Sequence, residues 1–201
     1  MKIAWLIIYG VTLIWSAVYP KDYFTWILEV APALIVIVVL IGTYKRFPLT
    51  SLAYILILVH CVVLMVGGHY TYAEVPLFNT LRDSFGFARN NYDKVGHFMQ
   101  GFVPAIIARE VILRKNIIGD RFWQNFFVVS FCLALSAFYE LIEWAVALIS
   151  GTSADAFLGT QGYIWDTQSD MAFALFGAIF ALVFLQSFHN KQLNKLVRVS
   201  S

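Results

Sequence analysis

The sequence predicts an all-α, polytopic membrane protein: a bundle of six transmembrane helices that forms a single integral membrane domain over residues 1–201. Hydrophobic residues make up 60% of the chain and charged residues only 13%, about half the charged share of a typical soluble domain. Several apolar stretches reach roughly 17–25 residues, the length that crosses a bilayer as a helix. Polar or basic connections separate these stretches, so each is predicted to be a span of its own.

The first three spans are expected at about residues 3–18, 23–43 and 49–69. The first follows Lys2; a cleaved signal peptide with a weak cleavage site at residues 16–18 is the alternative interpretation. The second carries Glu29 and Pro32 in its first turns. His60 lies near the midpoint of the third span, where a lone histidine is typical of a hydrogen-bonded interior residue.

The last three spans are expected at about residues 95–113, 122–149 and 169–188. A long polar connection, residues 70–94, precedes the fourth span, which Pro104 and the Arg109–Glu110 pair interrupt. The fifth span is long enough to tilt in the bilayer. Gly177 in the sixth span is predicted to let a neighbouring helix approach closely.

The distribution of Lys and Arg predicts the orientation of the chain. With six spans, both termini and two of the connections lie on one side of the membrane. Of the 14 basic residues, all but four fall on that side; the exceptions are Lys21, Arg82, Arg89 and Lys94. Because positively charged connections stay in the cytoplasm, both termini are expected to be cytoplasmic.

This topology brings polar side chains from separate spans to the same outer depth. The residues concerned are histidines and carboxylates that face a protein interior or a water-filled cavity at membrane depth. They form a pool of metal ligands suited to Zn²⁺, Mn²⁺ or Fe²⁺: His69, His97, Glu140, Glu143, Asp166 and Asp170. Glu140 and Glu143 share a helix face, although no pair matches a named zinc signature.

The residues of this outer region suggest particular roles. His97, with Glu140, Glu143 or Asp166, would bind the metal or move a proton, and Asp93, four residues earlier, would orient the His97 ring. Arg89 and Lys94 would hold an anionic group such as phosphate. Two further polar side chains are assigned to the substrate, Gln100 and Tyr72.

Three functions remain open for this outward-facing cavity. It could be a metal-dependent or acid–base site that acts on a headgroup-level or lipid-linked substrate. It could belong to a small transporter or ion-coupled carrier, although the cytoplasmic halves offer few polar groups beyond His60 and the Arg109–Glu110 pair. In a structural subunit, the carboxylates would instead form a buried network that neutralises Arg89 and Lys94.

The composition also limits the partners. A net charge of +2, without a basic stripe interleaved with aromatics, argues against nucleic-acid binding. Membrane lipids are the expected partners. Both cysteines, Cys61 and Cys132, lie in apolar stretches and are interpreted as packing residues.

Four motifs in fixed order resemble those of the uncharacterised bacterial inner-membrane proteins of the YjdF type: GGHYTYAEVP, RNNYDKVGHFMQGF, YELIEW and WDTQSDM. The resemblance implies a multi-pass protein of the bacterial inner membrane, and no established activity comes with it. Asp93, Lys94 and His97 also resemble the helix start of VanZ-like membrane proteins, a family associated with glycopeptide resistance. In that family an acidic residue begins a later span, as Asp166 or Asp170 does here. This second likeness implies envelope or lipid-linked chemistry.

Overall fold

The computed structural model describes residues 2–150, 157 and 160–200. Within these ranges, helices are the only regular secondary structure. Seven helices follow one another: α1 (Lys2–Ala17), α2 (Tyr23–Thr43), α3 (Ser51–His69), α4 (Pro76–Phe85), α5 (Tyr92–Arg114), α6 (Arg121–Ser150) and α8 (Asp166–Ser200). The predicted all-α class is therefore confirmed, and each predicted span corresponds to a helix.

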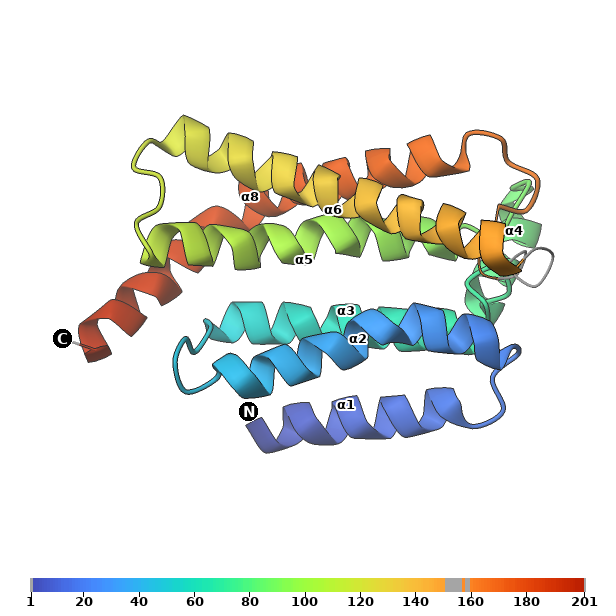
Figure 1. Ribbon diagram of the computed structural model, residues 1–201, viewed down its shortest axis with the longest axis horizontal. Helices are drawn as coiled ribbons and strands as arrows, with labels where there is room; N and C mark the ends of the chain where they lie inside the picture. The colour runs from blue at the N-terminus through green and yellow to red at the C-terminus, as the bar shows by residue number, and fades with distance from the viewer. Residues whose placement is uncertain (1, 151–156, 158–159, 201) are drawn as a thin grey trace.

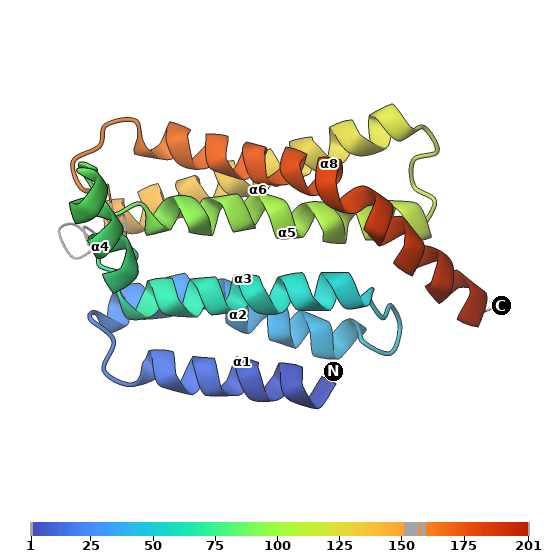
Figure 2. The ribbon, with the colours of Figure 1, turned by 180° about the vertical axis from the view of Figure 1, so that it is seen from behind.

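The long helices form two halves that lie side by side (Figures 1 and 2). α1, α2 and α3 make up one half, and α5, α6 and α8 make up the other. α3 packs on α5 and joins the halves, while α5 also packs on α6 and α8. α4 lies across the end at which α3 finishes and α5 begins (Figure 1). The N-terminal ends of α5 and α8 and the C-terminal ends of α3 and α6 therefore share this end of the molecule.

Among the described residues, four helices are long and apolar enough to cross a membrane: α2, α3, α6 and the part of α8 from Asp166 to Leu196. α1 is apolar but has only 16 residues. α5 is long enough, but it carries charged residues near both ends. Because α3, α6 and α8 surround α5, its polar side chains are directed at protein.

Two features of the helices differ from the prediction. α4 forms inside the connection expected to be irregular, with Pro76 in its first turn and Gly86 in the left-handed conformation after its last residue. Both positions are typical of helix ends, because proline needs no hydrogen-bonded N–H there and glycine adopts positive φ freely. α8 continues to Ser200, past the predicted end at residue 188, and extends beyond the other helices (Figure 2).

Two glycines allow a close contact between α5 and α8. A Cβ added to Gly177 of α8 would overlap the backbone of Phe98, and one added to Gly101 of α5 would overlap the backbone of Ala174. The predicted role of Gly177 as a close-packing point is confirmed. Small residues at these positions let α5 and α8 approach through their backbones.

Candidate functional site

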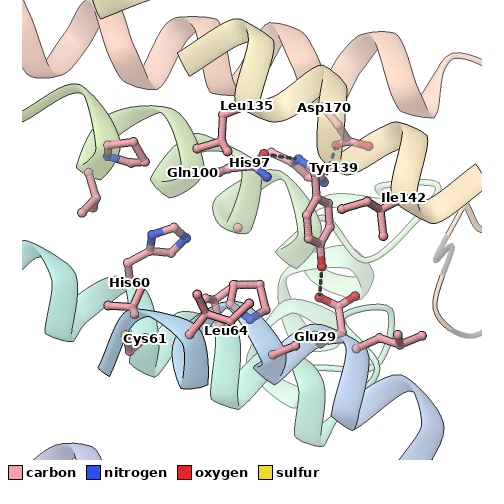
Figure 3. Close-up of a pocket in the computed structure, with 18 of the residues that line it drawn as sticks. Glu29, His60, Cys61, Leu64, His97, Gln100, Leu135, Tyr139, Ile142 and Asp170 are labelled. Atoms are coloured by element: carbon pink, nitrogen blue, oxygen red, sulfur yellow. Dashed lines mark hydrogen bonds and ion pairs between the residues drawn. The ribbon is translucent and has the colours of Figure 1, made fainter. Parts of the chain in front are cut away.

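A cavity of about 450 Å³ lies between the two halves of the bundle, lined by residues of α2, α3, α5 and α6 (Figure 3). Its deeper part is mostly apolar. Towards the α4 end it becomes polar, with side chains from both halves: Glu29, Tyr72, Asp93, His97, Gln100, Tyr139, Glu143 and Asp170. Phe157, from the connection between α6 and α8, is buried and also lines the cavity.

Helical spacing explains how the polar side chains reach this space. On α5, Asp93 and His97 are four residues apart and therefore lie on the same face. On α8, the same spacing aligns Asp166 with Asp170. The three polar helix ends meet because α6 runs up to the end of the bundle from which α5 and α8 start (Figure 1).

The ring of His97 has a defined hydrogen-bonding arrangement. Its Nδ1 lies 3.1 Å from Oε1 of Gln100, so Nδ1 carries the hydrogen and donates it to this amide oxygen. The lone pair of Nε2 is then available, and Nε2 lies 3.6 Å from Oδ1 of Asp170. Histidines that bind metals are commonly oriented in this way, by a hydrogen bond from the second ring nitrogen.

Gln100, and not Asp93, is therefore the residue that orients His97, which corrects the sequence-based assignment. Asp93 forms ion pairs with Arg89 and Lys94 instead. The i, i+4 spacing put the carboxylate on the correct face, but the two neighbouring cations compete for it more strongly than a neutral imidazole does.

Arg89 and Lys94 are surrounded by three aspartates. Nζ of Lys94 lies 2.8 Å from Asp166 and 2.7 Å from Asp170, and Arg89 contacts Asp93 and Asp166. All five side chains are buried. The expected role of Arg89 and Lys94 in holding an anionic substrate therefore does not fit, because their charges already compensate carboxylates. This group behaves as the buried network that the structural alternative describes.

Two sets of described residues place three potential metal ligands within 4.8 Å of one another. The first is Asp93, Asp166 and Asp170, but the ammonium of Lys94 already supplies the positive charge among them. The second is His97, Glu140 and Asp170. Here Oε1 of Glu140 is buried and lacks a hydrogen-bond partner among the described residues. A His and two carboxylates with an unsatisfied oxygen suit a divalent cation.

The other predicted site residues are distributed as follows. Glu143 lines the cavity but is not in either ligand set of the described residues. His69 is not in them either: its Nδ1 lies 3.0 Å from the carbonyl oxygen of Ser16, and its ring packs on Trp15. Because α3 ends against α1, His69 is directed away from α5. Tyr72 lines the cavity with a buried hydroxyl group that has no partner in the described part of the chain.

Two residues that the structure places in the cavity were not assigned from the sequence. The hydroxyl of Tyr139 donates a hydrogen bond to Oε2 of Glu29, with 3.2 Å between the oxygens (Figure 3). Glu29 could have been assigned from the sequence, because a carboxylate in the first turns of an otherwise apolar span is expected to have a functional role or a buried partner. Nothing in the sequence indicated that Tyr139, rather than its neighbour Glu140, would reach it.

A second buried polar group lies at the opposite end of the bundle. Nε2 of His189 is 3.0 Å from Glu110, and Nδ1 of His189 is 2.9 Å from Arg109. Thr50, which caps α3, and Arg114 also donate to Glu110. Since arginine can only donate, Nδ1 of His189 accepts and Nε2 donates to the carboxylate. Sequence analysis named the Arg109–Glu110 pair but not its partner on α8.

Fold and cavity together define a class: a helical membrane protein with a polar cavity between two halves. Comparison with known proteins is consistent with this class. The sequence matches the family described as "Predicted membrane protein (DUF2238)" over residues 1–191, and the chain belongs to this family. It is 50% identical over 183 residues to the inner membrane protein YjdF of Escherichia coli (strain K12), covering 91% of this chain and 88% of that protein. No solved structure matches it.

Proposed function

We propose that this inner-membrane protein binds the polar head of a membrane amphiphile in its cavity, at a divalent-cation site formed by His97, Glu140 and Asp170. The observation that carries the proposal is the convergence of these three ligands from α5, α6 and α8, with Oε1 of Glu140 buried and without a hydrogen-bond partner among the described residues. A cation such as Zn²⁺ would compensate the carboxylates and act as a Lewis acid towards a headgroup or a water molecule. His97, with its Nε2 lone pair available, would be the nitrogen ligand.

The proposal includes six membrane crossings with both termini in the cytoplasm. α1 is short, but its basic Lys2 can extend to the membrane surface, and the helix packs on α3. α5 can cross despite its charges, because they are paired within the protein at both of its ends. The excess of Lys and Arg on the side of the termini supports the orientation.

The transporter alternative is less well supported by the structure. A through-path would have to connect the cavity with the polar group around Glu110. Buried apolar residues of α3, α5, α6 and α8 lie between the two, among them Ala53, Ile106 and Cys132. In the described part of the chain this layer is mainly apolar, so it offers an ion or a polar solute few groups that could replace water.

The first prediction tests the cation site. The purified protein, loaded with Zn²⁺ or Mn²⁺ and then desalted, is expected to retain stoichiometric metal by mass spectrometry. His97→Ala and Glu140→Gln should lose it, because each removes a ligand. Gln100→Leu should weaken binding by about 10–100-fold, since it removes the hydrogen bond that orients His97.

His69→Ala is the matched control, because His69 lies outside the ligand set and should leave the metal content unchanged. Absence of bound metal from the loaded wild-type protein would contradict the proposed site. So would equal metal content in His97→Ala and His69→Ala.

A further inference from the structure

The cavity has an opening on the lipid-facing side of the bundle, between α2 and α6. In the part of the chain that the structure describes, these two helices barely contact each other, and the hydrogen bond from Tyr139 to Glu29 links them (Figure 3). Ile35 of α2 and Phe138 of α6 line the cavity and yet are 62% and 60% exposed. The cavity therefore reaches the surface that hydrocarbon chains cover in a membrane.

The lining of the cavity is amphipathic. Carboxylates and tyrosines gather towards the α4 end, whereas the deeper part is dominated by aliphatic side chains such as Ile57, Leu64 and Leu135. A volume of about 450 Å³ is in the range of cavities that bind small ligands, roughly 300–1,000 Å³. It suits a headgroup and the adjoining part of one chain, while the rest of an amphiphile stays in the bilayer.

The charge of the cavity selects the kind of headgroup. Glu29 is buried and accepts a hydrogen bond from neutral Tyr139, and no ion pair of Glu29 or Glu143 is found among the described residues. The nearest cationic side chains, Arg89 and Lys94, are engaged by aspartates. Two carboxylates at this depth stay ionised only beside a positive partner. Tyr72 and Tyr139 add aromatic faces that attract ammonium groups.

We infer that the occupant of the cavity is an amphiphile with an ammonium group in its head, which enters from the lipid between α2 and α6. The ammonium group pairs with Glu29 and Glu143, next to the cation site at His97. The inference rests on the proposed function, because it names the class of amphiphile that the headgroup site takes.

The headgroup is tested by photo-labelling in lipid nanodiscs. Two probes with the same diazirine-bearing acyl chain are compared, phosphatidylethanolamine, which has an ammonium group, and phosphatidylglycerol, which has none. Labelling of peptides that line the cavity should favour phosphatidylethanolamine by about tenfold, equivalent to about 1.4 kcal/mol. Glu29→Gln combined with Glu143→Gln should remove this preference. If the double variant does not fold, Glu143→Gln alone should reduce it.

The route is tested by a bulky substitution in the opening. Ile35→Trp should strongly reduce labelling by phosphatidylethanolamine. Val38→Trp, one turn along the same helix, 68% exposed and outside the cavity lining, should leave labelling unchanged. Both variants should keep the wild-type melting temperature and metal content.

The outcomes separate the two claims. Equal labelling by the two lipids in the wild-type protein would overturn the ammonium headgroup but leave the proposed function intact. Unchanged labelling in Ile35→Trp would overturn the lateral route. If neither lipid labels the cavity, the headgroup-binding function itself fails, and this inference fails with it.

Discussion

Lys94 lies among three aspartates, and its ammonium group makes these carboxylates a structural ion group instead of a metal site. Its ammonium group lies within 3.5 Å of Asp93, Asp166 and Asp170, in the place that a metal ion would otherwise take. With Arg89, it compensates carboxylates that come from both α5 and α8. In the nearby His97–Glu140–Asp170 set only Asp170 contacts Lys94, whereas no lysine or arginine pairs with Glu140 in the part of the chain that the structure describes. This difference separates a structural group from a candidate site.

The second prediction follows from that difference. Lys94→Met should lower the free energy of unfolding by about 3–5 kcal/mol, because it leaves buried carboxylates uncompensated. Lys21→Met is the control: its pair with Glu74 is half exposed and should contribute no more than about 1 kcal/mol. Chemical unfolding in detergent measures both. Equal effects of the two substitutions would contradict a buried ion group around Lys94.

At the scale of elements, α5 is the helix around which the others are arranged. It packs on α3, α6 and α8, and Gly101 and Gly177 bring the backbones of α5 and α8 together. This close contact is what places Asp170 of α8 next to His97 of α5. The glycine pair therefore supports the geometry of the candidate site from about one helical turn away on α5 and about two turns away on α8.

The third prediction concerns this contact. Gly177→Ala should destabilise the protein by about 1–3 kcal/mol, because the added methyl group meets the backbone of Phe98, which cannot move alone. Gly10→Ala in α1 is a suitable control: nothing lies within 4 Å of its added methyl group, and alanine is the better helix former. Thermal unfolding in detergent compares them. A Gly177→Ala protein as stable as Gly10→Ala would refute the close contact.

The extension of α8 is held to the bundle by His189, which leads to the fourth prediction. His189→Phe should leave Arg109 without its Nδ1 acceptor and deprive Glu110 of a donor, at a cost of about 1–3 kcal/mol or more for each buried group. The end of α8 should then open, and trypsin should cleave faster after the exposed Lys191. Asn190→Ala, an exposed partner of Arg109, should have a much smaller effect. Indistinguishable cleavage of the two variants would argue against an anchoring role of His189.

At the scale of the whole molecule, the two polar groups lie at opposite ends of the bundle with apolar layers between them. This is the arrangement expected if the bundle crosses a membrane, because buried charges are least costly near the interfaces. The group at the α4 end opens into the cavity through Asp93 and Asp170, whereas Glu110 is contacted by His189, Thr50 and Arg114. In the orientation that we propose, the cavity end faces the periplasm.

The fifth prediction tests that orientation. A reporter fused after Arg198 should be active only in its cytoplasmic form, and one inserted near Phe85, in the exposed end of α4, should be active only in its periplasmic form. The expectation rests on six crossings and on the excess of basic residues beside the termini. A periplasmic C-terminus would mean an odd number of crossings.

The sequence by itself determined that a helix forms at each of the six predicted spans and which of their ends share a side. Apolar stretches longer than a soluble core needs can satisfy their backbone in a membrane only as helices, and counting spans then brings His97, Glu140 and Asp170 to one end.

Only the tertiary structure decided which groups meet. Gln100 instead of Asp93 orients His97, Lys94 lies among aspartates, and Tyr139 reaches Glu29. Such pairings depend on how each helix is rotated and which helices are neighbours. Close packing between segments far apart in the chain sets the rotation of each helix and its neighbours. The residue pattern of a single segment predicts neither of them.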